Sequence, residues 1–464
     1  MAERPVRVGQ ELEVEITGFS HEGQGVGRYQ NFTLFIPEAL AGEKVRVRVT
    51  EVRKNFARGV VTAIMTPATD RAVPFCPVYD DCGGCQMQHL SYPGQLRMKH
   101  SQVVNAIERI GGMDNVTVHP VIGMTEPRGY RNKLQYPFGM SGESIVVGCY
   151  RRGTHQIIEA DGCMIQHPVH HPILATVKRL AASRRIPVYN EATGQGLLRH
   201  VLIKNGFHTG QVMVVLVTNG DWFPAGETLA MELASAHPEI RSVVQNINRS
   251  RGNVVLGREN RVLWGSDGII EELGGLKFKI SANSFFQVNP VQTELLYNRA
   301  VEYAGLTGGE RVVDAYCGVG SLTLFLARKA KEVYGIEVVL EAIADARRNA
   351  AMNGIENTRF LVGETETVLP KLVRDGLRFD VAVVDPPRSG CEASVLQALA
   401  EVGVARIVYV SCNPSTLARD LKILAELGYE AQEIQPVDMF PQTYHIECVV
   451  RVERKHTQDI VDRK

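Results

Sequence analysis

Hydrophobic and polar residues alternate along the first part of the chain. Residues 11–16 and 45–49 alternate with period two, and residues 58–61 do so less cleanly. Such alternation predicts short strands that bury one of their two faces. A glycine-rich turn at residues 23–28 separates the first two strands. We therefore expect a small β-barrel over residues 1–66.

The pattern changes after residue 66. Residues 91–112 carry apolar side chains at helical spacing and end in two glycines, which predicts a helix with the apolar residues Leu96, Val103, Ile107 and Ile110. This helix is a candidate to pack on the C-terminal domain. Short apolar runs at 212–217, 243–247 and 277–280 then predict a central, mostly antiparallel, β-rich domain over residues 67–283.

Strands and helices alternate from residue 284 onward. Pro290 opens a predicted helix over residues 291–304. A strand, a glycine turn, a helix and a second strand follow between residues 312 and 337, and two more apolar runs lie at 381–384 and 408–410. Continuous apolar runs are typical of strands buried on both faces of a parallel sheet. The predicted fold class is α/β, with a doubly wound, Rossmann-like domain over residues 284–464.

Composition indicates the class of protein and its location in the cell. A chain of 464 residues with 44% hydrophobic and 22% charged residues is typical of a soluble globular protein of roughly three domains. The formal net charge is zero, yet residues 44–58 carry six cations against one carboxylate, Glu51. The aliphatic runs are too short to span a membrane, and no signal-peptide pattern follows Met1. We expect a cytoplasmic protein with no membrane partner.

The cysteines indicate a metal site. Nine cysteines without an export signal favour metal binding or catalysis over a disulfide framework. Cys76, Cys82 and Cys85 form a C-x5-C-x2-C run, and Cys149 and Cys163 are candidates for a fourth ligand. We choose Cys163 for its turn-like context. One tight triple and a distant cysteine favour a 4Fe-4S cluster over zinc, which usually recruits two C-x2-C pairs. Buried free cysteines are the remaining alternative.

Three predicted strands of the C-terminal domain end in reactive side chains. Cys412 follows one strand and precedes an Asn-Pro pair, Asp385 ends another, and Glu337 ends a third. Ligands bind at the carboxyl ends of the strands in open α/β sheets. Most cysteines are small buried apolar residues, but the strand-end position favours Cys412 as a nucleophile. Glu447 adds a carboxylate that is either a base or a solvated strand residue.

The glycine turn indicates the cofactor. It reads Cys-Gly-Val-Gly at residues 317–320, and Thr323 stands where the NAD fingerprint has a third glycine. Glu337 is placed to bind a ribose diol. The combination resembles the S-adenosylmethionine-binding motif of Rossmann-like methyltransferases. Amine methyltransferases of this fold typically carry N-P-P-Y, whereas this chain has Asp-Pro-Pro-Arg at 385–388. We therefore expect methylation of carbon.

A thiol and a carboxylate at this edge suit methylation of a pyrimidine. C5 of uracil is a poor nucleophile, but addition of a thiolate at C6 produces an enolate whose C5 can attack a sulfonium methyl group. A base then removes the C5 proton, and elimination of the thiolate restores the ring. Cys412 would be the nucleophile and Glu447 the base.

Two segments predict RNA binding. Residues 1–66 resemble the TRAM module, an OB-like barrel of RNA-modifying enzymes, through G-x-G-x-G-R at 23–28 and F-x-x-G-x-V at 56–61. The cations of residues 44–58 would track a phosphate backbone, although the solvated face of a strand gives the same pattern. Residues 126–133 interleave cations with Tyr130, which could stack on an unpaired base; an exposed loop is the alternative.

Most of the chain resembles RNA uracil-5-methyltransferases of the type that modifies 23S ribosomal RNA. The matching motifs are C-x5-C-x2-C from Cys76, F-F-Q-V-N at 285–289, D-x-Y-C-G-x-G from Asp314, D-P-P-R from Asp385, S-C-N-P from Ser411 and H-x-E ending at Glu447. The resemblance implies a TRAM domain, a central domain that carries the cluster and a C-terminal methyltransferase domain.

The resemblance also implies residue roles. Contacts to S-adenosylmethionine are expected from Gln287, Tyr316, Glu337 and Asp385, with a further contact from Glu364. Cys412 is expected as the nucleophile and Glu447 as the base. Tyr316 stands where other members often carry Phe, which preserves a ring contact. Ser321 replaces an Asn found in some members, which puts one minor contact in doubt.

The predicted function is methylation of uridine C5 in 23S ribosomal RNA, without an obligate protein partner. The target uracil would have to leave its stack to enter the pocket. Uracil in the tRNA T-loop is the first alternative substrate, and a non-catalytic RNA-binding or assembly factor is the second alternative. Methylation of cytosine C5 would use the same covalent chemistry, but its usual Pro-Cys pair is absent. We expect a structural or RNA-positioning role for the cluster.

Overall fold

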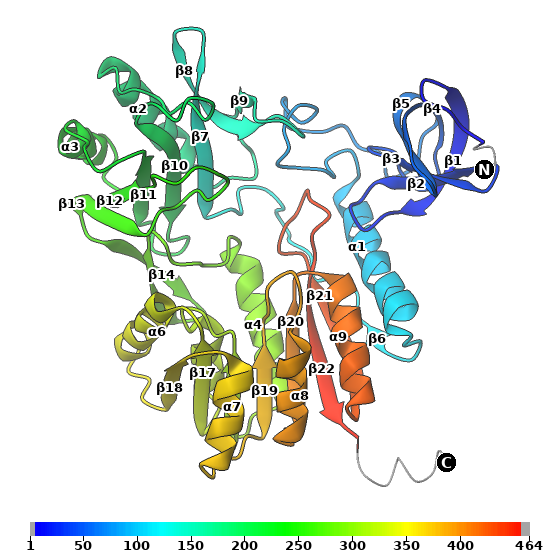
Figure 1. Cartoon of the computed structure of the whole chain (residues 1–464), viewed down its shortest axis with the longest axis vertical. Coiled ribbons are helices and arrows are strands. Elements are labelled where there is room, and N and C mark those ends of the chain that lie inside the picture. The colour runs from blue at the N-terminus through cyan, green and yellow to red at the C-terminus, as the bar shows by residue number, and fades with distance from the viewer. Residues whose placement is uncertain (1–4, 456–464) are drawn as a thin grey trace.

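The computed structural model describes residues 5–455, which form a barrel, a central sheet and a C-terminal sheet (Figure 1). The barrel is closed in the strand order β1-β2-β3-β5-β4. Its strands are β1 (Glu11–Phe19), β2 (Gly25–Tyr29), β3 (Phe32–Ile36), β4 (Lys44–Val52) and β5 (Phe56–Thr66). Apolar residues of the alternating pattern fill its core. A Cβ at Gly27 would lie 2.4 Å from Val14 Cγ1, so the close approach of β2 to β1 requires glycine there.

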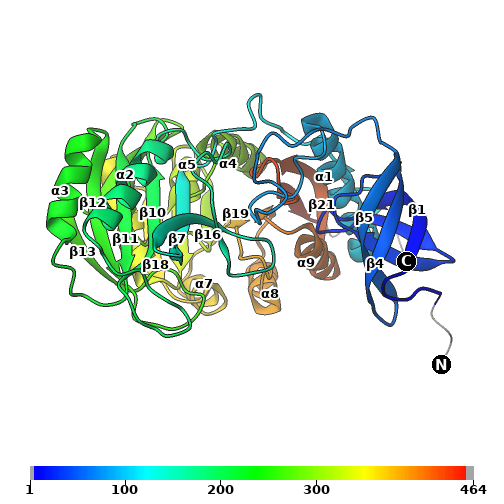
Figure 2. The same ribbon diagram turned by 90° about the horizontal axis from the view of Figure 1, so that it is seen from above.

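A long helix follows the barrel and lies beside it (Figure 2). α1 (Tyr92–Ala106) begins at Ser91, whose hydroxyl accepts a hydrogen bond from the backbone nitrogen of Gly94. It continues as a short π-helical turn, η1 (Ile107–Gly111), which ends at Gly112 with φ 67°. α1 and η1 pack against α9 (Pro414–Glu426) of the C-terminal part.

The central part is a seven-stranded sheet in the order β13-β12-β11-β10-β7-β8-β9. All neighbouring strands are antiparallel except β11 and β12. Two helices, α2 (His170–Ser183) and α3 (Gly226–Ala236), share its main core. The strands are β7 (Lys133–Ser141), β8 (Ser144–Tyr150), β9 (Ile157–Glu159), β10 (Leu198–Asn205), β11 (Val212–Thr218), β12 (Ile240–Ile247) and β13 (Glu259–Gly265). A separate hairpin of β14 (Gly268–Leu273) and β15 (Leu276–Ser281) follows.

The C-terminal part is an eight-stranded sheet in the order β18-β17-β16-β19-β20-β22-β21-β6. The first five strands of this order are parallel, β22 is antiparallel to β20 and β21, and β6 is parallel to β21. The strands are β16 (Arg311–Ala315), β17 (Glu332–Glu337), β18 (Thr358–Val362), β19 (Val381–Val384), β20 (Arg406–Ser411), β21 (Tyr429–Val437), β22 (Glu447–Arg454) and β6 (Thr117–Val118). The predicted α/β fold class is confirmed.

Helices cover both faces of this sheet, and each face has its own core. Residues of α4 (Pro290–Ala304), α5 (Ser321–Ala327) and α6 (Leu340–Met352) form one core. Residues of α1, η1, α7 (Thr365–Arg374), α8 (Ala393–Glu401) and α9 form the other. This arrangement explains why the strands are apolar without alternation, since both of their faces are buried.

The sheet also contains a strand from outside residues 284–464. β6 pairs with β21 through Thr117 and Val118 opposite Glu433 and Ile434. Two residues carry too little hydrophobic pattern to predict a strand, so the sequence gives no sign of this pairing. Separately, none of the helices within residues 5–455 is both long and apolar enough to cross a membrane.

Candidate active site

Cys412 and Glu447 lie at the same edge of the C-terminal sheet. Antiparallel pairing of β20 with β22 places Ser411 opposite Cys448, so the next residue of each strand toward this edge is Cys412 or Glu447. Asn413 turns the chain into α9, because its side chain accepts a hydrogen bond of 3.0 Å from the backbone nitrogen of Ser415. The structure thus brings the predicted nucleophile and the predicted base together.

The electrostatics of this edge are dominated by buried acids. Burial, followed by the charges of Glu447 and Asp385, raises the pKa of Cys412 to about 11, and Arg388 acts in the opposite direction. Burial, and then Asp385, also raises the pKa of Glu447 well above its ordinary value. Burial raises the pKa of Asp385 to about 6. The guanidinium of Arg388 is therefore the group that favours ionisation of both the thiol and the base.

The loop that carries Asp385 and Arg388 is fastened to α9. The carbonyl oxygen of Arg388 accepts hydrogen bonds from Asn413 Nδ2 at 3.2 Å and Thr416 Oγ1 at 3.3 Å. Arg388 Nη2 also lies 3.5 Å from His445 Nε2. Since α9 starts two residues after Cys412, the thiol and the backbone of Arg388 share one rigid support.

The glycine turn after β16 connects to Glu337 at the end of β17. Glu337 accepts hydrogen bonds from the backbone nitrogens of Gly318 at 3.3 Å and Val339 at 3.0 Å. Tyr316 has φ 68°, a left-handed conformation that is strained for a residue with a side chain and is common at functional sites. Next to Glu337, the side chains of Val338 and Leu340 are 60% and 61% exposed. The turn thus combines an oriented carboxylate with an apolar surface that is open to a ligand.

Three predicted cofactor positions, Gln287, Tyr316 and Glu364, lie on different supports. The carbonyl oxygen of Gln287 accepts a hydrogen bond of 3.0 Å from Asn132 Nδ2, which holds its loop to the central sheet. The side chain of Tyr316 contacts Cys391, and burial raises the pKa of its hydroxyl. Glu364 precedes α7, where its backbone is extended. The three positions therefore belong to three separate loops of the fold.

Five cysteines line one cavity of about 410 Å³ in the central part: Cys76, Cys82, Cys85, Cys149 and Cys163. A hydrogen bond from Cys149 lowers the pKa of Cys82 to about 6, whereas burial raises the pKa of Cys85 to about 12. The charges of Cys163 and Cys82 raise the pKa of Cys76 and Cys85 further. Within residues 5–455, no three His, Cys, Asp or Glu side chains converge closely enough to hold a metal ion. The five thiols thus line a cavity and do not converge on a single point.

Some residues of the site are missing from the sequence-based prediction. Arg388 follows the Asp-Pro-Pro run directly, and its charge beside a thiol could have marked it. Lys99 and Asp438 form a fully buried ion pair of 2.6 Å. Lys99 lies three residues after Leu96 and four before Val103, on the apolar face of α1. A cation on that face is the sequence feature that could have identified Lys99. Asp438 gives no comparable sign.

Comparisons with known proteins agree with this geometry. Residues 226–455 match the family model described as tRNA (Uracil-5-)-methyltransferase, and residues 5–62 match the TRAM domain. A protein of Bacillus cereus named as an uncharacterized RNA methyltransferase is 47% identical over 97% of this chain and 98% of its own length. One of Halalkalibacterium halodurans with a similar name is 48% identical over 97% and 99%.

A solved structure covers nearly the whole chain. The tRNA (uracil-54, C5)-methyltransferase of Pyrococcus abyssi, in complex with S-adenosyl-L-homocysteine, matches with a TM-score of 0.76 and 29% identity over 95% of this chain and 100% of that chain. Together with the relatives, it confirms the prediction of an RNA methyltransferase with a TRAM barrel and an α/β catalytic fold. The protein belongs to the RNA uracil-5-methyltransferase family.

Proposed function

We propose that the protein methylates C5 of a uridine in RNA through a covalent bond between Cys412 and C6 of the uracil. The observation that carries this proposal is the cross-strand placement of Cys412 and Glu447 beside Asp385 and Arg388. A protein that only binds RNA has no use for a thiol and a buried carboxylate at one strand edge. A non-catalytic role is therefore the weaker reading.

The proposed reaction has two halves, and a different residue acts in each. In the first, the Cys412 thiolate forms a bond to C6, and the electron pair moves to C5, which would take the methyl group of S-adenosylmethionine as the bond from that methyl to sulfur breaks and S-adenosylhomocysteine leaves. In the second, Glu447 accepts the C5 proton, and the bond between Cys412 and C6 breaks as the ring double bond returns. The raised pKa of Glu447 suits a group that must take a proton from carbon. Arg388 favours the thiolate that starts the sequence.

S-adenosylmethionine is supported as the methyl donor by the family and by the Pyrococcus abyssi structure. We assign Glu337 to its ribose hydroxyls, because the carboxylate is already oriented by two backbone nitrogens. The exposed Val338 and Leu340 would lie against an apolar part of the same ligand. Gln287, Tyr316 and Asp385 are proposed for the methionine side, nearer to Cys412.

We propose 23S ribosomal RNA as the substrate, with tRNA as the second candidate. The motif resemblance, which includes the TRAM barrel and the cysteine triple, supports ribosomal RNA. The similarity to a tRNA (uracil-54, C5)-methyltransferase supports tRNA. In either case the barrel offers exposed cations in β4 and β5, although Lys44 and Arg46 pair with Glu13 and Arg58 pairs with Glu51. An RNA substrate is consistent with the predicted cytoplasmic location.

Transfer of a radiolabelled methyl group to two transcripts separates the substrates. We expect the wild-type protein to label a 23S ribosomal transcript and to leave a tRNA transcript with an intact T-loop unlabelled. The same transcripts with the acceptor uridine changed to cytidine serve as controls. Label on tRNA alone would contradict the ribosomal assignment, and label on neither transcript would favour the RNA-binding factor.

For the cysteine cavity we propose a 4Fe-4S cluster held by Cys76, Cys82, Cys85 and Cys163. Each cysteine of such a cluster binds a different iron, so its thiols surround a volume. A zinc ion needs four thiolates around one point. The cavity of about 410 Å³ that these thiols line leaves room for such a cluster. It would cross-link residues 76–85 to the turn around residue 163, which is a structural role.

A further inference from the structure

The loop between β21 and β22 is fixed at every one of five consecutive carbonyl oxygens. These oxygens belong to residues 438–442, and each accepts a hydrogen bond from a group outside the two strands. The same loop leads through His445 directly into Glu447. A surface loop normally keeps some carbonyl oxygens in water and moves accordingly. In this loop, by contrast, all five of these carbonyl oxygens are bonded to other groups of the protein.

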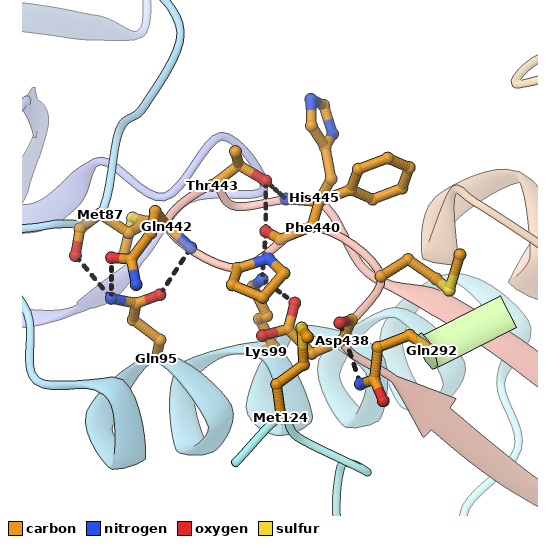
Figure 3. Close-up of polar contacts among 12 residues, drawn as sticks. Met87, Gln95, Lys99, Met124, Gln292, Asp438, Phe440, Gln442, Thr443 and His445 are labelled. Carbon is orange, nitrogen blue, oxygen red and sulfur yellow. Dashed lines mark hydrogen bonds and ion pairs between the residues drawn. The ribbon is translucent and has the colours of Figure 1, made fainter. Parts of the chain in front are cut away.

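Helix α1 provides the strongest of these contacts. Lys99 Nζ lies 2.6 Å from Asp438 Oδ1 and donates to the carbonyl oxygen of Phe440 at 3.1 Å. The Tyr92 hydroxyl donates to Asp438 Oδ2 at 2.9 Å. Gln95 and Gln442 exchange two bonds of 3.0 Å, from Gln95 Nε2 to Gln442 Oε1 and from the Gln442 nitrogen to Gln95 Oε1. Figure 3 shows Gln95 and Lys99 rising side by side from the helix to the loop.

Three other segments hold the loop from different directions. The backbone nitrogens of Gln86 and Met87, next to the cysteine run, both donate to the carbonyl oxygen of Gln442 at 3.0 Å. The Tyr130 hydroxyl donates to the carbonyl oxygen of Pro441 at 3.0 Å. From the start of α4, Asn289 and Gln292 bond to the carbonyl oxygens of residues 439 and 438. Donors from four separate stretches of chain therefore converge here.

Gln442 shows that the contacts impose a conformation on the loop. Its φ is 71°, in the left-handed region that a side chain disfavours. Such a conformation persists only when its surroundings determine it, and here Gln442 is held through its nitrogen, its oxygen and its side chain. A buried polar network with this many paired groups gives rigidity and not only stability.

We propose that Gln95 and Lys99 of α1 are positioning residues for Glu447, and that they control removal of the C5 proton. This inference rests on the proposed function. Gln95 and Lys99 bond to the loop and not to the strand end that carries Cys412, so we expect formation of the adduct to depend on them less than removal of the C5 proton does. Glu447 follows the loop directly, so a shift of the loop moves the base away from C5. Small displacements of a catalytic group can reduce a rate by about a hundredfold.

The experiment follows the two halves of the reaction separately in a single turnover. RNA with tritium at uridine C5 reports loss of the C5 proton, and S-adenosylmethionine with a 14C methyl group reports methylation. For Gln95→Ala we expect methyl transfer within about threefold of wild type and tritium release slower by at least about tenfold. Methylated RNA bound to protein should therefore accumulate on a denaturing gel, as with the reference variant Glu447→Gln.

The controls separate positioning from general damage. Asn105→Ala alters an exposed residue of α1 whose side chain donates a hydrogen bond to the carbonyl oxygen of Ser101 in the same helix, and both rates should stay at the wild-type value. Lys99→Met alone leaves a buried carboxylate unpaired, so the double variant Lys99→Met with Asp438→Asn tests the ion pair in a protein that can still fold. It should repeat the Gln95→Ala result.

Parallel loss of both rates in the α1 variants, or unchanged tritium release, would overturn the positioning role. If wild-type protein transferred methyl without any bound intermediate, the covalent mechanism itself would fail, and the positioning role with it. Thermal unfolding of each variant shows whether a loss of rate is caused by lower stability of the protein.

Discussion

The buried carboxylate of Asp420 ties α9 to the loop that carries Asp385 and Arg388. Asp420 Oδ2 accepts hydrogen bonds from the backbone nitrogen of Cys391 at 2.8 Å and from the Tyr409 hydroxyl at 2.6 Å. The loop that carries Arg388 and the helix that follows Cys412 are thereby held together. Asp420 therefore affects the site without touching a substrate.

Replacement of Asp420 by alanine should therefore weaken both stability and activity. The change removes the acceptor of the buried Tyr409 hydroxyl and leaves the Cys391 nitrogen only its longer bond of 3.3 Å to that hydroxyl, which costs roughly 1–3 kcal/mol in the free energy of unfolding. Because Arg388 then loses its fixed position beside Cys412, we expect the rate of adduct formation to fall by about tenfold. Chemical denaturation and single-turnover methylation measure the two effects. Lys422→Ala, an exposed change on the same helix, should alter neither.

Arg388 should set the pH dependence of the Cys412 thiol. The pKa of about 11 means that the thiolate fraction rises tenfold for each pH unit between neutral pH and that value. Arg388→Gln removes a cation that favours the thiolate, so the pKa should rise and alkylation by iodoacetamide at a given pH should slow. Peptide mass spectrometry of Cys412 across pH 7–11 measures the shift. An unchanged profile would mean that the guanidinium does not act on the thiol.

Asp314 should make stability depend on pH. Burial raises its pKa from 3.8 to about 7, although Thr323 Oγ1 donates a hydrogen bond of 2.5 Å to it. A carboxyl group whose pKa is raised on folding stabilises the protein at low pH, and this contribution disappears as the pH rises toward 7. Asp314→Asn stays neutral and keeps an acceptor for Thr323.

The stability of Asp314→Asn relative to wild type should thus increase from pH 5 to pH 8.5. The two pH units between 5 and 7 correspond to about 3 kcal/mol in the free energy of unfolding. Urea denaturation of both proteins at the two pH values gives this difference. A difference that stays constant would show that Asp314 is already ionised in the folded protein at pH 5.

The choice of Cys163 over Cys149 can be tested by iron content. After anaerobic purification, Cys163→Ser should lose most of its iron and its visible absorbance, because a cluster with three thiolates is readily lost. Cys149→Ser should retain both, since Cys149 bonds to Cys82 and is not required as a ligand in the proposed set. Loss of iron in Cys149→Ser with retention in Cys163→Ser would reverse the assignment, and zinc in place of iron would refute the cluster.

Sequence patterns predict the parts of this structure that depend on periodicity. The alternation at residues 11–16 and 45–49 predicts the barrel, and the apolar runs that end at Ala315, Val384 and Ser411 predict the parallel strands. The strand-end positions of Cys412 and Asp385 follow from those runs. Their proximity follows in turn, because parallel strands bring their carboxyl ends to one edge.

Contacts between distant segments leave little trace in such patterns. The pairing of β6 with β21 involves only two residues of β6. The hydrogen bond between Gln95 and Gln442 joins two glutamines, and glutamine is equally common on exposed surfaces, so neither residue type predicts the contact. Lys99 interrupts the apolar stripe of α1, which could have marked it as buried, but its partner Asp438 lies 339 residues away. Arrangements of this kind depend on how whole domains pack, and local sequence does not encode them.

The most direct measurement uses RNA transcripts that contain 5-fluorouridine. Fluorine at C5 cannot leave as a cation, so Glu447 has no proton to remove, and the reaction stops at the methylated covalent adduct. With S-adenosylmethionine, wild-type protein should form a stable complex whose peptide, located by mass spectrometry, joins Cys412 to a methylated 5-fluorouracil. Cys412→Ala should form none. An adduct at a different cysteine, or methylated RNA without any adduct, would contradict the covalent role of Cys412.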